Sequence, residues 1–221
     1  MPGRPCWVEI STGAFEDNYR LLAAACGGGA GVSATSASAQ ESGPVELLAI
    51  VKANAYGHGL AECAPAAMRA GTRWLGVTSV EEGVAARALA IAAGYPKTGI
   101  LAIGGPFPGQ GAEAIANRVT AVAWDHWHLD ELEAAARASG LGAGAVPVHL
   151  ELDTGMSRQG VGSNELDGIL ARFKADAPLR LNGLMTHLYA ADQTDTKLPV
   201  RSCILPTRLT SSPWARIVAT R

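Results

Sequence analysis

Residues 45–59 read VELLAIVKANAYGHG, an apolar run that ends in a lysine and is followed by glycines. A buried ammonium group is costly unless it is paired or deprotonated, so Lys52 at the end of such a run is unusual. Glycine lets a backbone approach a ligand closely, which Gly57 and Gly59 would allow here. We expect a buried strand over Val45–Ala53 that presents Lys52 at its carboxyl end.

Short apolar runs alternate with Ala-rich stretches from this point onward. The repeat of about 25 to 35 residues is typical of βα units with right-handed crossovers. Six consecutive units favour a (β/α)8 TIM-type barrel, and no Gly-x-Gly-x-x-Gly motif follows the first strand, which weakens a dinucleotide-binding sheet. The predicted strands are Val45–Ala53, Trp74–Thr78, Ile100–Gly104, Val119–Trp124, Val146–Asp153 and Leu179–His187, and the helices between them Ala61–Ala70, Val80–Ala93, Ala112–Asn117, Leu129–Ser139 and Glu165–Lys174.

The repeat stops after the sixth predicted strand, whereas a complete barrel takes roughly 250 residues and eight strands. A helix capped by Ser11 or Thr12 precedes the repeat and runs to Cys26, and residues 27–44 form a Gly/Ser/Ala-rich loop. Residues 196–221 contain five basic residues and no acidic one. We expect an incomplete α/β barrel domain over residues 1–195 and a divergent basic tail over 196–221, as in a truncated or frame-shifted chain.

Composition excludes several classes of protein. The chain has 221 residues, a net charge of −2, 48% hydrophobic residues and 17% charged residues, which excludes a disordered protein and makes nucleic acid an unsuitable partner. No apolar stretch approaches about 18 residues, and the N-terminus does not resemble a secretory signal. We therefore expect a cytoplasmic protein with no membrane partner, whose widely spaced cysteines (Cys6, Cys26, Cys63 and Cys203) are reduced thiols.

Two polar clusters are expected to be structural. His126 and His128 stand near carboxylates, but their spacing puts the two rings on different helix faces, so we predict no metal site. Asp125 is instead predicted to cap the following helix. Asp153, at the end of the fifth predicted strand, is expected to orient the backbone.

Lys52 is the strongest candidate for chemistry, because a desolvated lysine becomes a nucleophilic amine that condenses with aldehydes. The run VKANAYGHG at 51–59 resembles the cofactor-lysine motif of bacterial alanine racemases, as do HLELDTGMSRQG at 149–160 and GLMTHLYAAD at 183–192. The resemblance covers roughly residues 7–195. It implies a barrel enzyme that uses pyridoxal 5'-phosphate (PLP) to interconvert L-alanine and D-alanine for cell-wall peptidoglycan.

The resemblance also assigns roles to five residues. Lys52 would hold PLP as an internal aldimine and act as one of two acid–base groups. Tyr56 would bind the cofactor phosphate, and His187 would join the hydrogen-bonded network around the cofactor. Arg158 would contact the cofactor's phenolic oxygen and the substrate carboxylate. Glu151 stands where many members carry a carbamylated lysine, and its carboxylate would support Arg158.

An intact family member is a homodimer whose C-terminal β-domain supplies a catalytic tyrosine to the partner subunit, and nothing here resembles that domain. We therefore expect little or no racemase activity from this chain. One alternative is a non-catalytic PLP-binding or misfolded fragment. The other is a barrel-type PLP amino-acid decarboxylase, whose lysine motif also reads Lys-Ala-Asn. The continuation Ala-Tyr-Gly-His-Gly at 55–59 favours the racemase.

Overall fold

The computed structural model of the protein describes residues 8–26, 46–189 and 217–220. Two compact units divide the chain: one comprises Met1–Val77 and Ala85–Ile100, the other Thr78–Val84 and Leu101–Arg221. Within the described ranges, none of the helices is both long enough and apolar enough to cross a membrane.

The strands follow one another in one sheet in chain order, β1 to β7. The pairs β1–β2, β4–β5, β5–β6 and β6–β7 are parallel, which confirms the predicted parallel α/β architecture. The strands are β1 (Ala49–Ile50), β2 (Trp74–Val77), β3 (Gly99–Ala102), β4 (Val119–Ala123), β5 (Val146–Leu152), β6 (Leu179–His187) and β7 (Ile217–Thr220).

Two strands differ from the prediction by more than one or two residues at an end. β1 is two residues long rather than nine. Before it, the carbonyl of Leu47 accepts hydrogen bonds from Tyr19 Oη (2.7 Å) and Thr72 Oγ1 (3.2 Å), and after it the chain turns at Lys52–Tyr56. β7 lies in the segment for which no strand was predicted. Its sequence IVAT contains three β-branched residues, a composition that favours extended backbone, and the strand pairs in parallel with β6.

Most helices correspond to predicted ones, with shifts of up to four residues at their ends. The helix at Lys52–Tyr56 was not predicted, because that segment was expected to be the end of a strand and the turn after it. α6 begins three residues earlier than predicted, because the Asp125 side chain caps it by accepting from the backbone N–H of Trp127 at 3.2 Å. The helices are α1 (Thr12–Cys26), α2 (Lys52–Tyr56), α3 (Leu60–Arg69), α4 (Val80–Ala92), α5 (Gly111–Ala116), α6 (His126–Ala138) and α7 (Leu166–Leu170).

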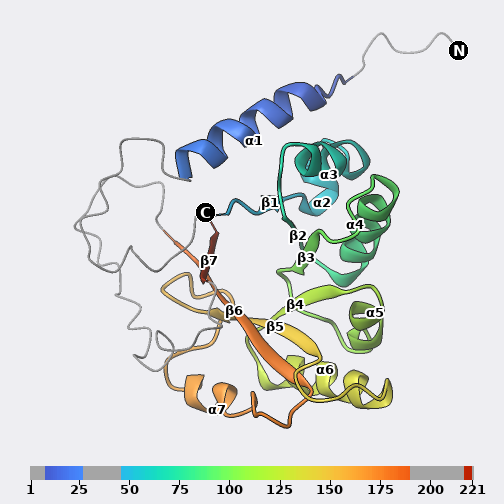
Figure 1. Cartoon of the computed structure of the whole chain (residues 1–221). Coiled ribbons are helices and arrows are strands. Elements are labelled where there is room, and N and C mark those ends of the chain that lie inside the picture. The colour runs from blue at the N-terminus through green and yellow to red at the C-terminus, as the bar shows by residue number, and fades with distance from the viewer. Residues whose placement is uncertain (1–7, 27–45, 190–216, 221) are drawn as a thin grey trace, which may run out of the picture. The chain divides into compact units, whose positions relative to one another are not determined.

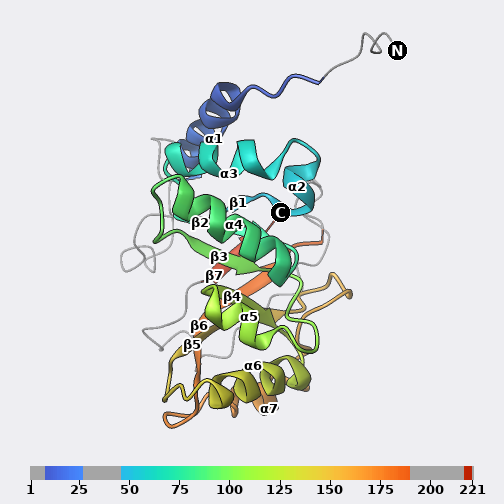
Figure 2. The ribbon, with the colours of Figure 1, turned by 90° about the vertical axis from the view of Figure 1, so that its right-hand side faces the viewer.

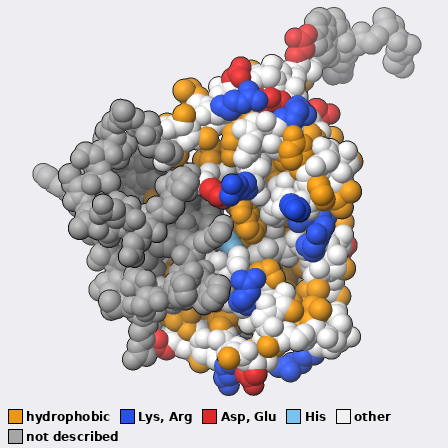
Figure 3. Space-filling model, viewed as in Figure 1, with side chains coloured by type: hydrophobic (Ala, Val, Ile, Leu, Met, Phe, Trp, Pro, Cys, Tyr) orange, Lys and Arg blue, Asp and Glu red, His pale blue; other side chains and the backbone are white. Residues whose placement is uncertain are grey.

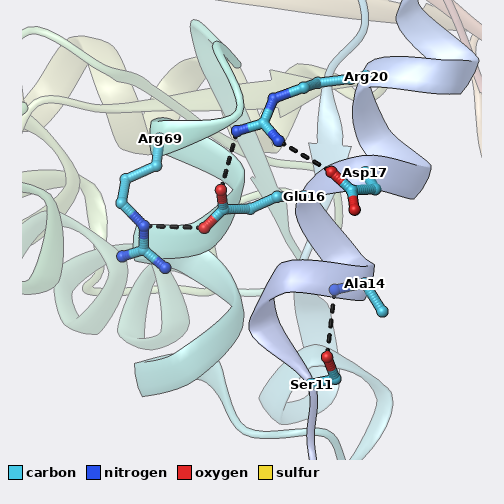
Figure 4. Close-up of polar contacts among 6 residues, drawn as sticks. All are labelled: Ser11, Ala14, Glu16, Asp17, Arg20 and Arg69. Atoms are coloured by element: carbon cyan, nitrogen blue, oxygen red, sulfur yellow. Dashed lines mark hydrogen bonds and ion pairs between the residues drawn. The ribbon is translucent and has the colours of Figure 1, made fainter.

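In the first unit, α1 lies beside α3 (Figures 1 and 2). Ser11 Oγ accepts from the backbone N–H of Ala14 at 3.2 Å, which confirms the cap at the start of α1. Glu16 joins the two helices, because its carboxylate accepts from Arg69 at 2.8 Å and from Arg20 at 2.9 Å (Figure 4).

In the second unit, α6 and α7 lie along one side of β5 and β6 (Figure 1). Val146, Val148, Leu150 and Leu152 alternate along β5 and join a buried apolar cluster with Leu129 and Leu132 of α6 and Ile169 of α7. Because successive side chains of a strand point to opposite faces, His149 and Glu151 must point away from these helices. The polar face of β5 is therefore the candidate position for a site.

The pairing of β5 with β6 contains a bulge. Val148 is paired with Leu181, but the next residue, His149, is paired with Gly183, so Asn182 is the extra residue in β6. The side chains beyond it follow the opposite alternation, with Leu184 in the apolar cluster and Met185 paired with Glu151.

Candidate functional site

Lys52 lies at the carboxyl end of β1, as predicted. The backbone N–H of Val51 donates to the carbonyl of Gly76 on β2 at 2.8 Å, and this is the last bond of the pairing before the chain turns. Lys52 is half-buried, whereas Tyr56 is 61% exposed. The Lys52 Nζ atom stands 5.9 Å from the centre of the Tyr56 ring, so the amine and the phenol occupy one side of the same turn.

That turn is left-handed. Ala53, Asn54, Ala55 and Tyr56 all have φ between 50° and 55°, and Gly57 follows with φ of 84°. Each non-glycine residue in this conformation costs roughly 1–2 kcal/mol, so the surrounding structure must hold the turn in place. Strained backbone of this kind concentrates at functional sites.

Asn54 provides much of the hold on the turn. Its backbone carbonyl accepts from the N–H of Gly59 at 2.9 Å, and its side-chain Oδ1 accepts from the N–H of Leu60 at 2.7 Å. The Leu60 N–H belongs to the first turn of α3, where helices leave donors without partners. The sequence analysis missed this role, although asparagine is among the few residues that readily adopt positive φ.

Glu151 is the most deeply buried acidic group of the candidate site, at 1% exposure. Burial raises the pKa of its carboxyl, and two neighbours oppose that effect: the amide of Gln159, which donates to Oε2 at 2.5 Å, and the positive charge of Arg158. The negative charge of Asp153 acts in the same direction as burial. The positive charge of Arg158 therefore favours the ionised form of Glu151.

The loop after β5 presents Arg158 as an exposed side chain. Asp153 Oδ1 shapes this loop by accepting from the backbone N–H groups of Gly155 (2.9 Å) and Ser157 (3.0 Å), which confirms that Asp153 orients backbone. Gly160 closes the loop so tightly that a Cβ there would lie 2.5 Å from the Asp153 nitrogen. The guanidinium of Arg158 thus projects from a loop whose backbone is fixed at both ends.

His187 is the last residue of β6, two positions after Met185, and so shares the face of Glu151. The same face carries His149, whose ring lies over Gly183: a Cβ at that glycine would be 2.8 Å from the ring. A residue other than glycine would push the imidazole away. The polar face of β5 and β6 therefore holds two histidines and a buried carboxylate.

The predicted residues thus occupy two places. Lys52 and Tyr56 lie together in the first unit, whereas Glu151, Arg158 and His187 belong to the second. The sequence analysis also missed Gln159, the hydrogen-bond donor to Glu151. Its polar side chain, directly after the arginine of SRQG, could have suggested a role in the site, but the sequence does not show that it bonds to Glu151.

His128 of α6 has a structural setting. His128 is 1% exposed, with its ring 3.8 Å from that of Trp127, and burial lowers the pKa of His128 to about 4. In the described part of the chain, no group of three or more His, Cys, Asp or Glu side chains is arranged to hold a metal ion. Figure 3 shows charged side chains of both signs scattered among hydrophobic ones on one face.

Comparisons with known proteins identify the family of the chain. The family described as the alanine racemase N-terminal domain matches residues 10–202. The alanine racemase of Beutenbergia cavernae is 39% identical over 159 residues, which cover 71% of this chain and 40% of that protein. The alanine racemase of Mycobacterium tuberculosis is 34% identical over 202 residues, covering 89% of this chain and 46% of the relative. This chain therefore spans less than half the length of these curated relatives.

Solved structures confirm the barrel-type fold. The alanine racemase of a D-cycloserine-producing Streptomyces lavendulae superimposes with a TM-score of 0.67 at 31% identity, over 87% of this chain and 44% of that one. The Bartonella henselae alanine racemase, solved with covalently bound pyridoxal phosphate, gives a TM-score of 0.71 at 22% identity, over 96% and 53% of the two chains. At 22% identity, the similarity to the Bartonella henselae structure concerns the fold alone.

Proposed function

We propose, from the premise that the chain belongs to the alanine racemase N-terminal domain family, that it carries the cofactor-binding part of a PLP-dependent alanine racemase. The observation that carries the proposal is Lys52 at the carboxyl end of β1, on a left-handed turn that also presents Tyr56. In barrel enzymes, functional groups lie at this end of the strands. In the whole protein we further propose alanine as substrate, a homodimer, a cytoplasmic location and a role in supplying D-alanine for peptidoglycan.

The residues present fit a phosphate-bearing aldehyde. A half-buried primary amine can bond to the aldehyde carbon, and the exposed hydroxyl of Tyr56 on the same turn can donate to a phosphate oxygen. When bound, PLP supplies an electron sink that stabilises the carbanion left by loss of the α-proton. The Lys52 amine would remove and return that proton on one side of the α-carbon.

Arg158 would bind the substrate carboxylate, because its guanidinium is permanently charged and presents paired donors. Glu151 would orient Arg158, in the role that a carbamylated lysine has in many family members. A glutamate carries its own negative charge and needs no carbon dioxide to acquire it. His187, on the same face as Glu151, would complete the polar surroundings of the cofactor.

Racemisation requires an acid–base group on each side of the α-carbon, and Lys52 supplies one of them. We therefore propose that the chain of 221 residues on its own binds PLP without rapid turnover of alanine. Turnover near 10 per second, a rate ordinary for enzymes, would contradict this. A decarboxylase relative remains the less favoured reading, since the Ala-Tyr-Gly-His-Gly continuation at 55–59 is that of the racemases.

Reduction with borohydride after addition of PLP, followed by peptide mass mapping, tests the proposal. We expect a pyridoxyl adduct confined to Lys52, while the exposed Lys97 and Lys174 stay unmodified. The matched control is Lys52→Arg, which keeps the charge but cannot form the imine. Equal labelling of all three lysines, or no adduct on Lys52, would show that the chain does not form the site.

A further inference from the structure

Gln159 uses its side-chain amide to join two elements of the second unit. The Nε2 atom donates to Glu151 Oε2 on β5 at 2.5 Å and to the carbonyl of Ile103, directly after β3, at 3.2 Å. An amide nitrogen carries two hydrogens, and here each hydrogen has an acceptor. The carbonyl of Ile103 and the ionised carboxylate of Glu151 can only accept hydrogen bonds. The NH2 end of the Gln159 amide must therefore face them, which fixes the orientation of the amide.

Glu151 needs such a donor because of where β5 places it. The side chain is 1% exposed and is paired across the sheet with Met185, a residue that offers no hydrogen-bond donor from its side chain. The charged groups that act on it are Arg158, which favours the ionised carboxyl, and Asp153, which disfavours it. A buried carboxylate is costly unless it is hydrogen-bonded and paired.

We propose that Gln159 is a positioning residue that holds Glu151 as a carboxylate in a fixed orientation beside Arg158. The inference rests on the proposed function for its catalytic meaning, because Arg158 is there assigned to the substrate carboxylate. Gln159 links the Oε2 atom of Glu151 to the carbonyl of Ile103, directly after β3, and under this proposal the Oε1 atom would face Arg158. Without the Gln159 amide, the carboxylate of Glu151 loses a hydrogen bond that stabilises its ionised form, and its side-chain torsions are less constrained.

A second amide–carboxylate pair in the same unit provides a matched control. Gln110 Nε2 donates to Glu81 Oε1, and both side chains belong to an exposed contact. The pKa of Glu81 is lowered, first by a bond to its own backbone N–H and then by Ser79. Loss of the Gln110 amide therefore removes a similar hydrogen bond at a place where water can replace it.

The test is a carbon-13 NMR titration of the full chain labelled at the glutamate carboxyl carbons, with Glu151→Gln to assign the signal. We expect the titration midpoint of Glu151 to move to higher pH in Gln159→Met and further still in Gln159→Glu, which places a second carboxylate beside it. Gln110→Met should leave the Glu151 midpoint unchanged. An unchanged midpoint in Gln159→Met would overturn the proposal.

One measurement needs no substitution. In the unsubstituted chain, the side-chain amide protons of Gln159 should exchange with deuterated water more slowly than those of Gln110, and equal exchange rates would overturn the proposal even if a Gln159 variant failed to fold. Borohydride labelling of Lys52 by PLP, run in parallel, separates the two ideas. Labelling without a midpoint shift defeats the role of Gln159 alone, and a midpoint shift without labelling defeats the proposed function alone.

Discussion

The side-chain oxygen of Asn54 accepts a hydrogen bond from the backbone N–H of Leu60 at 2.7 Å, and this bond ties the left-handed turn to the first residue of α3. The lysine proposed to bind the cofactor lies at the start of that turn. The position of the amine therefore depends on a residue that does not touch it.

Asn54→Ala should destabilise the first unit by about 1–2 kcal/mol, because a capping bond is lost and alanine adopts positive φ less readily than asparagine. Borohydride labelling of Lys52 should fall with it. Urea unfolding and adduct mapping would measure the two effects. Asn117→Ala is the matched control, since Asn117 has φ of −96° at the end of α5. Equal losses in both variants would remove any special role for Asn54.

Tyr56→Phe should weaken PLP binding without affecting folding. A hydrogen bond to a charged group contributes about 1.5–3 kcal/mol, which corresponds to roughly a 10- to 100-fold rise in Kd. Tyr56 is 61% exposed, so the ring can stay in place when the hydroxyl is removed. Absorbance titration with PLP would measure Kd, with the partly exposed Tyr95→Phe as control. An unchanged Kd would show that Tyr56 does not reach the phosphate.

Glu151→Gln should change how stability depends on pH. Burial raises the pKa of Glu151 above its unfolded value of 4.5, so the folded chain binds more protons than the unfolded chain between the two pKa values. Stability from this group is therefore fully present below pH 4.5 and is lost as the pH rises through the folded pKa. The variant lacks that loss. From pH 4 to pH 7, the free energy of unfolding of the variant should rise relative to that of the unsubstituted chain. If the two free energies change with pH in parallel, this prediction is wrong.

Glu16→Gln should act in the opposite direction. Hydrogen bonds from Arg69, and then Arg20, lower the pKa of Glu16, so its stabilising effect is present above the unfolded value of 4.5 and is lost as the pH falls through the folded pKa. The variant should be less stable than the unsubstituted chain at pH 7 and equal to it in strong acid. Asp17→Asn is the control, because Asp17 contacts Arg20 from an exposed position. Added salt should shrink the Glu16 effect.

The parts of the fold that could be predicted are those where the spacing of apolar residues within one helix or strand determines its ends. β6 begins and ends at the predicted residues, Leu179 and His187, and α1 ends at Cys26, because apolar spacing alone determines these segments. β1 was predicted too long, and the hydrogen bonds to the Leu47 carbonyl before it come from Tyr19 and Thr72, residues distant in the sequence.

The site was predictable to the same extent. Lys52 and Asp153 are where the sequence placed them, because a strand end is a local feature. Gln159 was not found, because its two acceptors lie 8 and 56 positions away and only the folded sheet brings them together. The left-handed turn at 53–56 was missed for another reason: one glycine signals positive φ, but a run of such residues depends on bonds supplied by Asn54.

The single extra residue at Asn182 has a consequence for what the sheet can tolerate. Before it, Leu179 and Leu181 face the helices at odd-numbered positions; after it, that side passes to Leu184. Because Asn182 is the extra residue, removing it would let Gly183 follow Leu181 directly and pair with His149 without a bulge. Leu184 would then still face the helices, and Met185 and His187 would still face the opposite side. The strand should therefore tolerate the loss of one residue at 182 better than a loss elsewhere along its length.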